Sequence, residues 1–175
     1  VGHHNAANAL AALAMGEALG LAREATLEAL REFPGLPHRA AWVADVRGVR
    51  YVNDSKGTNV GATLAAVAGF AGPLLLIVGG DGKNQDFRPL AAAFAGKVRR
   101  ALLIGRDAPA LAAALQGVCD LEHCDSLESA VVAAARAAHP GDTVLLSPAC
   151  ASLDMFRDYG HRGEVFAAAV RRLAA

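Results

Sequence analysis

Residues 74–78 constrain the fold most, because they form a short, uninterrupted aliphatic run, Leu-Leu-Leu-Ile-Val. A run of this length suits a strand, and a strand without polar side chains must be covered on both faces. After it, strand-like and helical patterns alternate. Strands are predicted at 98–104, 118–121 and 143–146, and helices at 87–94, 108–115 and 126–138. This alternation is typical of a doubly wound α/β domain, a mostly parallel, Rossmann-like sheet with helices on both faces.

Other segments extend this domain at both ends. Segments 42–46 and 49–52 flank Arg47-Gly48 and predict a β-hairpin, which adds an antiparallel strand at one edge of the sheet. A helix is predicted at 60–70, and two more close the chain near 151–159 and 163–173.

The N-terminal part has a different character. Residues 5–19 and 23–33 have the pattern of two helices, and Pro34-Gly35-Leu36-Pro37 cannot continue a helix. We therefore predict a boundary here, between one part at 1–36 and another at 37–175. Two helices alone bury little apolar surface, and the first residue is Val1, so we expect the first part to belong to a longer protein.

Composition excludes several classes of protein. Seventeen basic and seventeen acidic residues cancel, so no overall field attracts nucleic acid or an anionic membrane, and neither partner is expected. No apolar run approaches the ~18 residues of a membrane span. The odd, sparse set Cys119, Cys124 and Cys150 indicates a reducing compartment, the cytoplasm. Cys119, His123 and Cys124 lack the ligand number and spacing of a zinc site, so no metal site is predicted.

Three polar loops follow predicted strands, at 53–59, 79–84 and 147–152. Ligands of open α/β sheets bind beyond the carboxyl ends of the strands, and a lysine near a helix N-terminus favours an anion. The residues alone leave an alternative open, in which 53–59 is a turn whose Thr58 or Asn59 caps the helix. The loop at 79–84 does not complete the phosphate-binding P-loop pattern. Ile77 stands where that pattern has its first glycine, and Asn84 stands where it has serine or threonine. We interpret the glycines of this loop as a tight strand exit, with Lys83 as the functional member.

Five motifs follow one another along nearly the whole chain: Gly2-x-His4-Asn5-x-x-Asn8-Ala9, Gly35-Leu36-Pro37-His38-Arg39, Asn53-Asp54-Ser55-Lys56-x-Thr58-Asn59, Gly79-Gly80-Asp81-Gly82-Lys83, and Leu146-Ser147-Pro148-Ala149-Cys150-Ala151-Ser152-Leu153-Asp154. In these motifs the chain resembles the C-terminal part of the Mur ligase family, the ATP-dependent amide ligases that build the peptidoglycan stem peptide. The third motif contains a lysine, Lys56, which in this family distinguishes the members that add D-glutamate. Two positions depart from the family pattern, Gly57 for alanine and Tyr159 for phenylalanine.

The resemblance implies a reaction in which ATP phosphorylates the carboxylate of UDP-MurNAc-L-alanine and the amine of D-glutamate displaces phosphate from the acyl phosphate. It also implies a cytoplasmic, monomeric enzyme of cell-wall synthesis that uses Mg²⁺. Residues 1–36 would be the last helices of a truncated central ATP-binding domain, and 37–175 the domain that binds the incoming amino acid. The P-loop and the magnesium ligands would lie outside this chain, so we expect the 175 residues alone to contain no catalytic residue and to be inactive.

The resemblance also implies residue roles, position by position. The amino-acid substrate would contact Lys56, Thr58, Lys83, Ser152, Leu153 and Tyr159, and ATP would contact Asn5, Asn8, His38, Arg39 and Asp54. Three alternatives remain at this point: a Mur ligase that adds another amino acid, a folylpolyglutamate synthase, and a non-catalytic Rossmann-like binding domain.

Overall fold

The computed structural model describes residues 3–174, with side chains from residue 6 onward, and clusters into two compact units, Val1–Leu36 and Pro37–Ala175. The first unit consists of α1 (His3–Ala18) and α2 (Arg23–Glu32). The helices approach closely where Gly16 meets Thr26, whose Oγ1 would lie 3.1 Å from a Cβ on the glycine. Leu10, Met15 and Leu19 are all more than half exposed, so this pair of helices leaves most of its large apolar side chains uncovered.

The second unit is built on one six-stranded sheet. Its strands are β1 (Ala41–Val46), β2 (Val49–Asn53), β3 (Leu74–Gly79), β4 (Val98–Ile104), β5 (Asp120–His123) and β6 (Thr143–Leu146). They lie in the order β1-β2-β6-β3-β4-β5, and only the β1–β2 pair is antiparallel. The predicted parallel sheet with a hairpin strand at its edge is therefore confirmed. The last strand in the chain, β6, inserts between β2 and β3.

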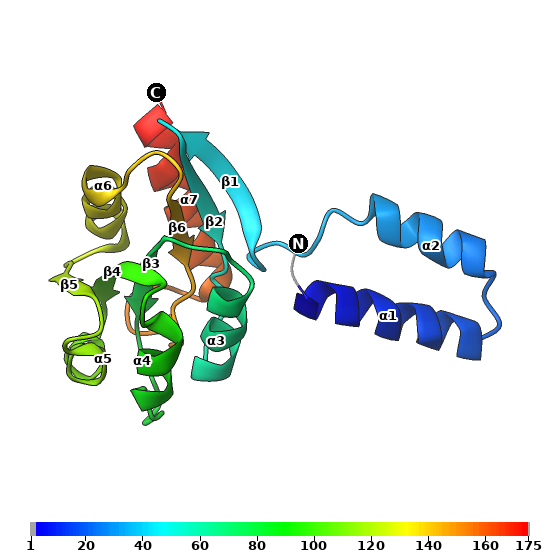
Figure 1. Ribbon diagram of the computed structural model, residues 1–175, viewed down its shortest axis with the longest axis horizontal. Helices are drawn as coiled ribbons and strands as arrows, with labels where there is room; N and C mark the ends of the chain where they lie inside the picture. The colour runs from blue at the N-terminus through cyan, green and yellow to red at the C-terminus, as the bar shows by residue number, and fades with distance from the viewer. Residues whose placement is uncertain (1–2, 175) are drawn as a thin grey trace. The chain divides into compact units, whose positions relative to one another are not determined.

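Helices cover both faces of this sheet (Figure 1). One face carries α3 (Val60–Ala68), α4 (Arg88–Phe94) and α5 (Ala108–Leu115), and the other carries α6 (Leu127–Ala137) and α7 (Tyr159–Ala174). Side chains of β3 alternate between the two layers: Leu74, Leu76 and Val78 face the first, Leu75 and Ile77 the second. All five are fully buried, and each such burial stabilises the fold by about 1.5–3 kcal/mol. Among the described residues, no helix is both long and apolar enough to cross a membrane.

The helix predicted at 151–159 is wrong. The structure has turns and bends there, because the backbone of Ala151 pairs with a different segment. Its N–H donates to the Asp81 carbonyl oxygen at 2.8 Å, and its carbonyl oxygen accepts from the Asp81 N–H at 3.0 Å. Pairing across loops thus replaces the local helical hydrogen bonds that the sequence pattern favoured.

Two predicted boundaries move by a few residues. Helix α7 begins at Tyr159 rather than at 163, because the Asp158 carboxylate accepts a hydrogen bond from the His161 N–H at 2.7 Å and so serves the first turn. The strand predicted at 118–121 lies two residues later, as β5, where it pairs in register with β4.

Candidate functional site

Three loops begin side by side at one edge of the sheet. Asn53, the last residue of β2, pairs with Leu146 at the end of β6, and Leu146 pairs with Ile77 of β3. These strands are parallel, so the loops that follow them leave the sheet in the same direction. The three loops predicted to converge at the carboxyl edge are therefore neighbours. We call this edge the loop mouth, formed by residues 53–59, 79–85 and 147–158.

The first loop is held by side-chain hydrogen bonds to its own backbone and to the helices beside it. The Asn53 side chain accepts from the Ser55 N–H at 3.1 Å and donates to the Gly163 carbonyl oxygen at 3.0 Å. At the far end, the Asn59 side chain accepts from the Ala62 N–H at 2.9 Å and caps α3. The capping role left open by the sequence is thus real for Asn59. The residues between Asn53 and Asn59, among them Lys56 and Thr58, do not take part in the helix cap.

Lys56 lies over an aromatic ring instead of beside a carboxylate. Its Nζ is 3.9 Å from the ring centroid of Tyr159, and the His38 ring meets the same tyrosine edge-on, with centroids 6.2 Å apart. The Lys56 N–H donates to the His38 carbonyl oxygen at 3.0 Å, which fixes the lysine backbone. A cation–π contact of this kind is worth about 0.5–1 kcal/mol at a partly exposed site. No acidic side chain in the described part of the chain pairs with Lys56, so its charge is available to an anion.

The second loop holds Lys83 by its backbone and exposes its side chain. The Gly82 N–H donates to the Asp107 carboxylate at 2.6 Å, and the Lys83 N–H donates to Asp81 Oδ1 at 3.0 Å. Lys83 has a left-handed φ of 50°. Its ammonium group makes no ion pair within residues 3–174. The loop therefore presents a second unpaired cation on a fixed backbone.

Gln85 connects the second loop to its neighbours. Its Oε1 accepts from the Val60 N–H at 3.0 Å, at the start of α3. Its Nε2 donates to the carbonyl oxygens of Gly82 at 2.8 Å and Ala149 at 3.3 Å. One amide side chain thus joins the second and third loops of the mouth to the start of α3, which follows the first loop.

The glycines after β3 serve the backbone, as the sequence interpretation held. Gly79 and Gly80 have φ of 132° and 128°, a region that side chains rarely allow. A Cβ on Gly79 would overlap the Ile104 carbonyl oxygen, and one on Gly80 would overlap that of Ala151. Neither glycine has room for a side chain, whatever ligand the loop mouth takes.

Asp54 connects the first loop to two other segments. Its Oδ1 accepts from the Ala40 N–H at 3.1 Å, and its Oδ2 accepts from the Ser147 hydroxyl at 2.7 Å. The Ser147 and Thr63 hydroxyls are 3.1 Å apart and share a further hydrogen bond. A Cβ on Gly57 would lie 2.7 Å from Asp54 Oδ2 and 2.8 Å from Ser147 Oγ. Glycine at this position therefore fits a hydrogen-bonded pair that alanine would displace.

Of the residues predicted to contact ATP, His38, Arg39 and Asp54 belong to the second unit, and Asn5 and Asn8 to the first. His38 Nδ1 is 3.1 Å from the Asn53 side-chain nitrogen. The segment that contains His38 is also joined to Asp54, because the Ala40 N–H donates to the Asp54 carboxylate. Arg39 is exposed and, among the described residues, has no hydrogen bond or ion pair from its side chain. Asn8 is exposed on α1 in the first unit, and the side chain of Asn5 lies outside the described residues.

The third loop combines a buried serine with an exposed leucine. Ser152 is 3% exposed, and its carbonyl oxygen accepts from the Phe156 N–H at 2.7 Å. The next residue, Leu153, is 65% exposed. Cys150, just before them, is fully buried, and burial raises the pKa of its thiol to about 12, so it does not act as a nucleophile near neutral pH.

Sequence reasoning missed Arg162, which is fully buried beneath the first and third loops. Its Nε and Nη2 donate to the Ser55 hydroxyl and carbonyl oxygens at 3.0 and 2.8 Å, and its Nη1 donates to the Cys150 carbonyl oxygen at 3.1 Å. Burial lowers its pKa to about 10. One sequence signal could have located it. Arg162 has helical spacing to Phe166 and Ala169, which are buried on the same face of α7.

The charge of this edge suits an anion. Two unpaired ammonium groups, from Lys56 and Lys83, stand on loops whose backbones are fixed by hydrogen bonds, which suits a ligand with more than one negative charge. Among the described residues no three His, Cys, Asp or Glu side chains gather as metal ligands.

This arrangement defines a Rossmann-like ligand-binding domain with a cationic mouth. The sequence model of the family described as "Mur ligase, glutamate ligase domain" matches residues 38–150, and the chain belongs to that family.

Individual relatives extend the match beyond the domain. The chain is 59% identical over 175 residues to the UDP-N-acetylmuramoylalanine–D-glutamate ligase of Aromatoleum aromaticum, covering 98% of this chain and 38% of that protein. Among solved structures, the UDP-N-acetylmuramate-alanine ligase of Thermotoga maritima superposes with a TM-score of 0.72 at 16% identity, over 98% of this chain and 39% of that one. The MurF ligase of T. maritima in complex with ADP does so with a TM-score of 0.59 at 15% identity, over 91% and 37%. At these identities the solved structures establish the fold alone.

Proposed function

We propose that the chain is the C-terminal part of an ATP-dependent ligase that adds D-glutamate to UDP-MurNAc-L-alanine in peptidoglycan synthesis. The observation that carries the proposal is the pair of unpaired lysines at the loop mouth of a chain 59% identical to a D-glutamate ligase. The chain spans 38% of the length of that relative, so the reaction belongs to the longer protein.

In this proposal the loop mouth binds D-glutamate, which carries two carboxylates and one ammonium group. Lys56, Thr58 and Lys83 take the side-chain carboxylate, because the two ammonium groups supply the opposite charge. Ser152, Leu153 and Tyr159 surround the other end of the amino acid. Holding the substrate by its carboxylates leaves its amine free to attack an acyl phosphate, and such positioning is a main source of rate in amide ligation.

Nucleotide binding falls to a different set of residues. We assign His38, Arg39 and Asp54 in the second unit, and Asn5 and Asn8 in the first, to ATP. Arg39 supports this assignment because its guanidinium is exposed and has no partner in residues 3–174. Mg²⁺ would serve the reaction by neutralising phosphate charge, but no described cluster in this chain fits it, so we assign it no ligand here.

The same proposal makes the 175 residues inactive when isolated. They contain no Gly-x-x-x-x-Gly-Lys-Ser/Thr sequence and, in our assignment, no catalytic residue. The proposed site of action is the cytoplasm, where ATP and the nucleotide-linked precursor are both available, and we infer a monomer.

Amide NMR of the isotope-labelled chain tests the amino-acid site. Millimolar D-glutamate is expected to shift resonances at 56–58, 83 and 152–153, and D-glutamine, which lacks the side-chain charge, to bind about tenfold more weakly. Lys83→Ala should weaken D-glutamate binding to a similar degree. Lys97→Ala is the matched control, because this half-exposed lysine lies at the opposite edge of the sheet, before β4. Equal binding of D-glutamate and D-glutamine would refute the site.

A chimeric enzyme tests the reaction. The C-terminal 38% of the Aromatoleum aromaticum ligase is replaced by this chain, and phosphate release is measured with UDP-MurNAc-L-alanine, ATP and a panel of amino acids. D-Glutamate is expected to be preferred, and Lys83→Ala should raise its KM much more than that of ATP. Preference for another amino acid would overturn the proposed substrate. Phosphate release by the isolated chain with all substrates present would overturn its inactivity.

A further inference from the structure

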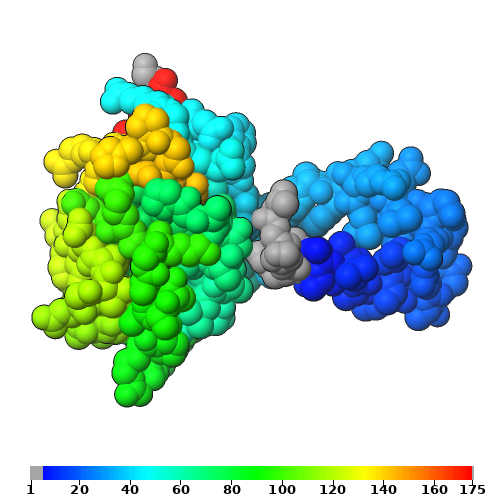
Figure 2. Space-filling view, in the orientation of Figure 1, coloured from blue at the N-terminus to red at the C-terminus, as the bar shows by residue number. Residues whose placement is uncertain are grey.

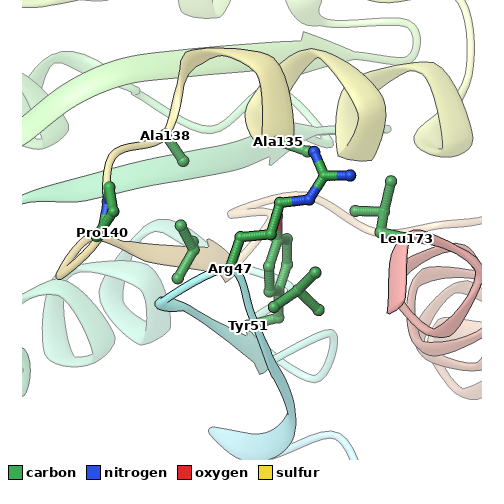
Figure 3. Close-up of a pocket in the computed structure, with 8 residues that line it drawn as sticks. Arg47, Tyr51, Ala135, Ala138, Pro140 and Leu173 are labelled. Atoms are coloured by element: carbon green, nitrogen blue, oxygen red, sulfur yellow. The ribbon is translucent and has the colours of Figure 1, made fainter. Parts of the chain in front are cut away.

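A cavity lies at the opposite edge of the sheet from the loop mouth. It has a volume of about 320 Å³ and is enclosed by the β1–β2 hairpin and the C-terminal ends of α6 and α7 (Figure 3). We call it the hairpin pocket. Its apolar walls include Val49 of the hairpin, Ala135 of α6 and Leu173 of α7, with Arg47 and Tyr51 as its polar members. Its volume is at the lower end of the roughly 300–1,000 Å³ typical of sites for small ligands.

The hairpin turn that forms one wall is held in place. The Gly141 N–H donates to the Gly48 carbonyl oxygen at 2.8 Å, which joins the turn to the connection between α6 and β6. Figure 2 shows the two segments in contact, the hairpin in cyan and the connection in gold. Gly48 has a φ of 77°, and a Cβ there would lie 3.1 Å from that of Pro140. The pocket is therefore preformed by backbone contacts.

Tyr51 provides a hydroxyl group that no described side chain or backbone atom binds. The residue is 1% exposed, lines the pocket, and in the described part of the chain its hydroxyl makes no hydrogen bond. Because the side chain lines the pocket and its hydroxyl oxygen is not sealed from solvent, the hydroxyl can bind a ligand there in place of water. Burial also raises the pKa of the phenol, so the hydroxyl stays protonated and acts as a donor at neutral pH.

Arg47 provides a second donor at the same place. Figure 3 shows its side chain extending over the Tyr51 ring towards Ala135 and Leu173. Within residues 3–174 its guanidinium has no hydrogen bond and no ion pair, and no acidic residue lines the pocket. A guanidinium and a hydroxyl that both donate select a carboxylate, and the apolar walls select a hydrocarbon body.

We propose that the hairpin pocket binds a small monocarboxylate with an aromatic or branched aliphatic body, its carboxylate between Arg47 and the Tyr51 hydroxyl. This inference is independent of the proposed ligase function, because the pocket lies at the amino ends of the parallel strands and the loop mouth at their carboxyl ends. The two sites share one element, β2, since Tyr51 precedes Asn53 by two residues on that strand.

Amide NMR of the 175-residue chain, titrated with phenylacetate, tests the proposal. Saturable shifts are expected at 46–51, 135–140 and 173. The neutral analogue phenylacetamide should bind about tenfold more weakly, the effect of one lost charge-assisted hydrogen bond. Equal binding of the acid and the amide would overturn the proposal. So would shifts confined to the loop mouth, which is also cationic.

Two variants and a control separate the polar contacts from the fold. Arg47→Gln and Tyr51→Phe should each weaken phenylacetate binding about tenfold, since each removes one donor to the carboxylate. Tyr51→Phe should leave the melting temperature unchanged or raise it, because the hydroxyl it removes has no partner. Arg50→Gln is the matched control: this exposed arginine of the same hairpin faces Asp45 at 3.6 Å, and its loss should not change binding. Unchanged affinity in both Arg47→Gln and Tyr51→Phe would refute the assigned site.

Discussion

The buried guanidinium of Arg162 gives the sharpest test of how the loop mouth is held together. Arg162→Lys keeps the charge, but one ammonium group cannot reach the Ser55 hydroxyl, the Ser55 carbonyl and the Cys150 carbonyl from one place. Two hydrogen bonds from a charged donor are lost, at about 1.5–3 kcal/mol each, so we expect the free energy of unfolding to fall by about 3–6 kcal/mol.

Arg162→Met is the informative comparison. It removes all three hydrogen bonds but also the cost of burying a charge. Burial lowers the pKa of Arg162 from its ordinary range to about 10, which corresponds to a cost of about 3 kcal/mol. The methionine variant is therefore expected to be destabilised less than the lysine variant, although it loses more hydrogen bonds.

Denaturant unfolding at neutral pH, followed by far-ultraviolet circular dichroism, measures both variants. Equal m-values would confirm that the midpoints report stability. Arg88→Met is the control, because the Arg88 side chain is 85% exposed and its loss should change stability by about 0.5 kcal/mol or less. Two results would refute the reasoning that the geometry of the guanidinium matters more than its charge. One is a lysine variant that is as stable as the natural chain, and the other is a lysine variant that is more stable than the methionine variant.

Three further predictions concern other parts of the second unit. Ser126→Ala should destabilise the chain by about 1 kcal/mol in the same unfolding experiment, because it removes the capping box at the start of α6; unchanged stability would show that the box contributes nothing. The Cys150 thiol should react with a disulfide reagent about a hundredfold more slowly in the native chain than in denaturant, and fast native labelling would contradict its burial. Folding raises the pKa of this thiol from 9.0 to about 12, so its contribution to stability is present below pH 9 and is lost between about pH 9 and 12. The free energy of unfolding should fall by up to about 1.4 kcal/mol per pH unit in that range. Cys150→Ala should show a shallower loss across the same range.

Local sequence patterns predicted helices and strands well where residues close together in the chain decide the structure. The aliphatic run at 74–78 was expected to be covered on both faces, and its residues are fully buried. The turn at Arg47-Gly48 was expected to form a hairpin, and β1 and β2 pair across it. The pattern failed at 151–159, where pairing of Ala151 with Asp81, seventy residues earlier in the chain, outweighs the helical tendency of the segment. A propensity of a few tenths of a kcal/mol per residue cannot compete with such tertiary contacts.

The candidate site divides in the same way. The sequence placed Lys56, Lys83 and Ser152 on loops after strands, and the rule for parallel sheets put those loops at one edge. It did not establish the insertion of β6 between β2 and β3, which makes the three loops neighbours. It also did not show that the Lys56 ammonium lies on the Tyr159 ring, a contact between the first loop and the first residue of α7.

By itself the sequence determined the α/β class, the boundaries of most elements and the loops that carry the cationic side chains. These properties follow from the order of apolar, polar and turn-forming residues over short stretches of chain. Only the tertiary structure decided the order of the strands, the burial of Arg162 and the hairpin pocket. Each depends on groups far apart in the chain, such as Ser55 and Arg162, which are separated by 107 residues. Such groups meet only when the whole sheet packs, and a local pattern contains no information about which distant atom will satisfy a buried donor.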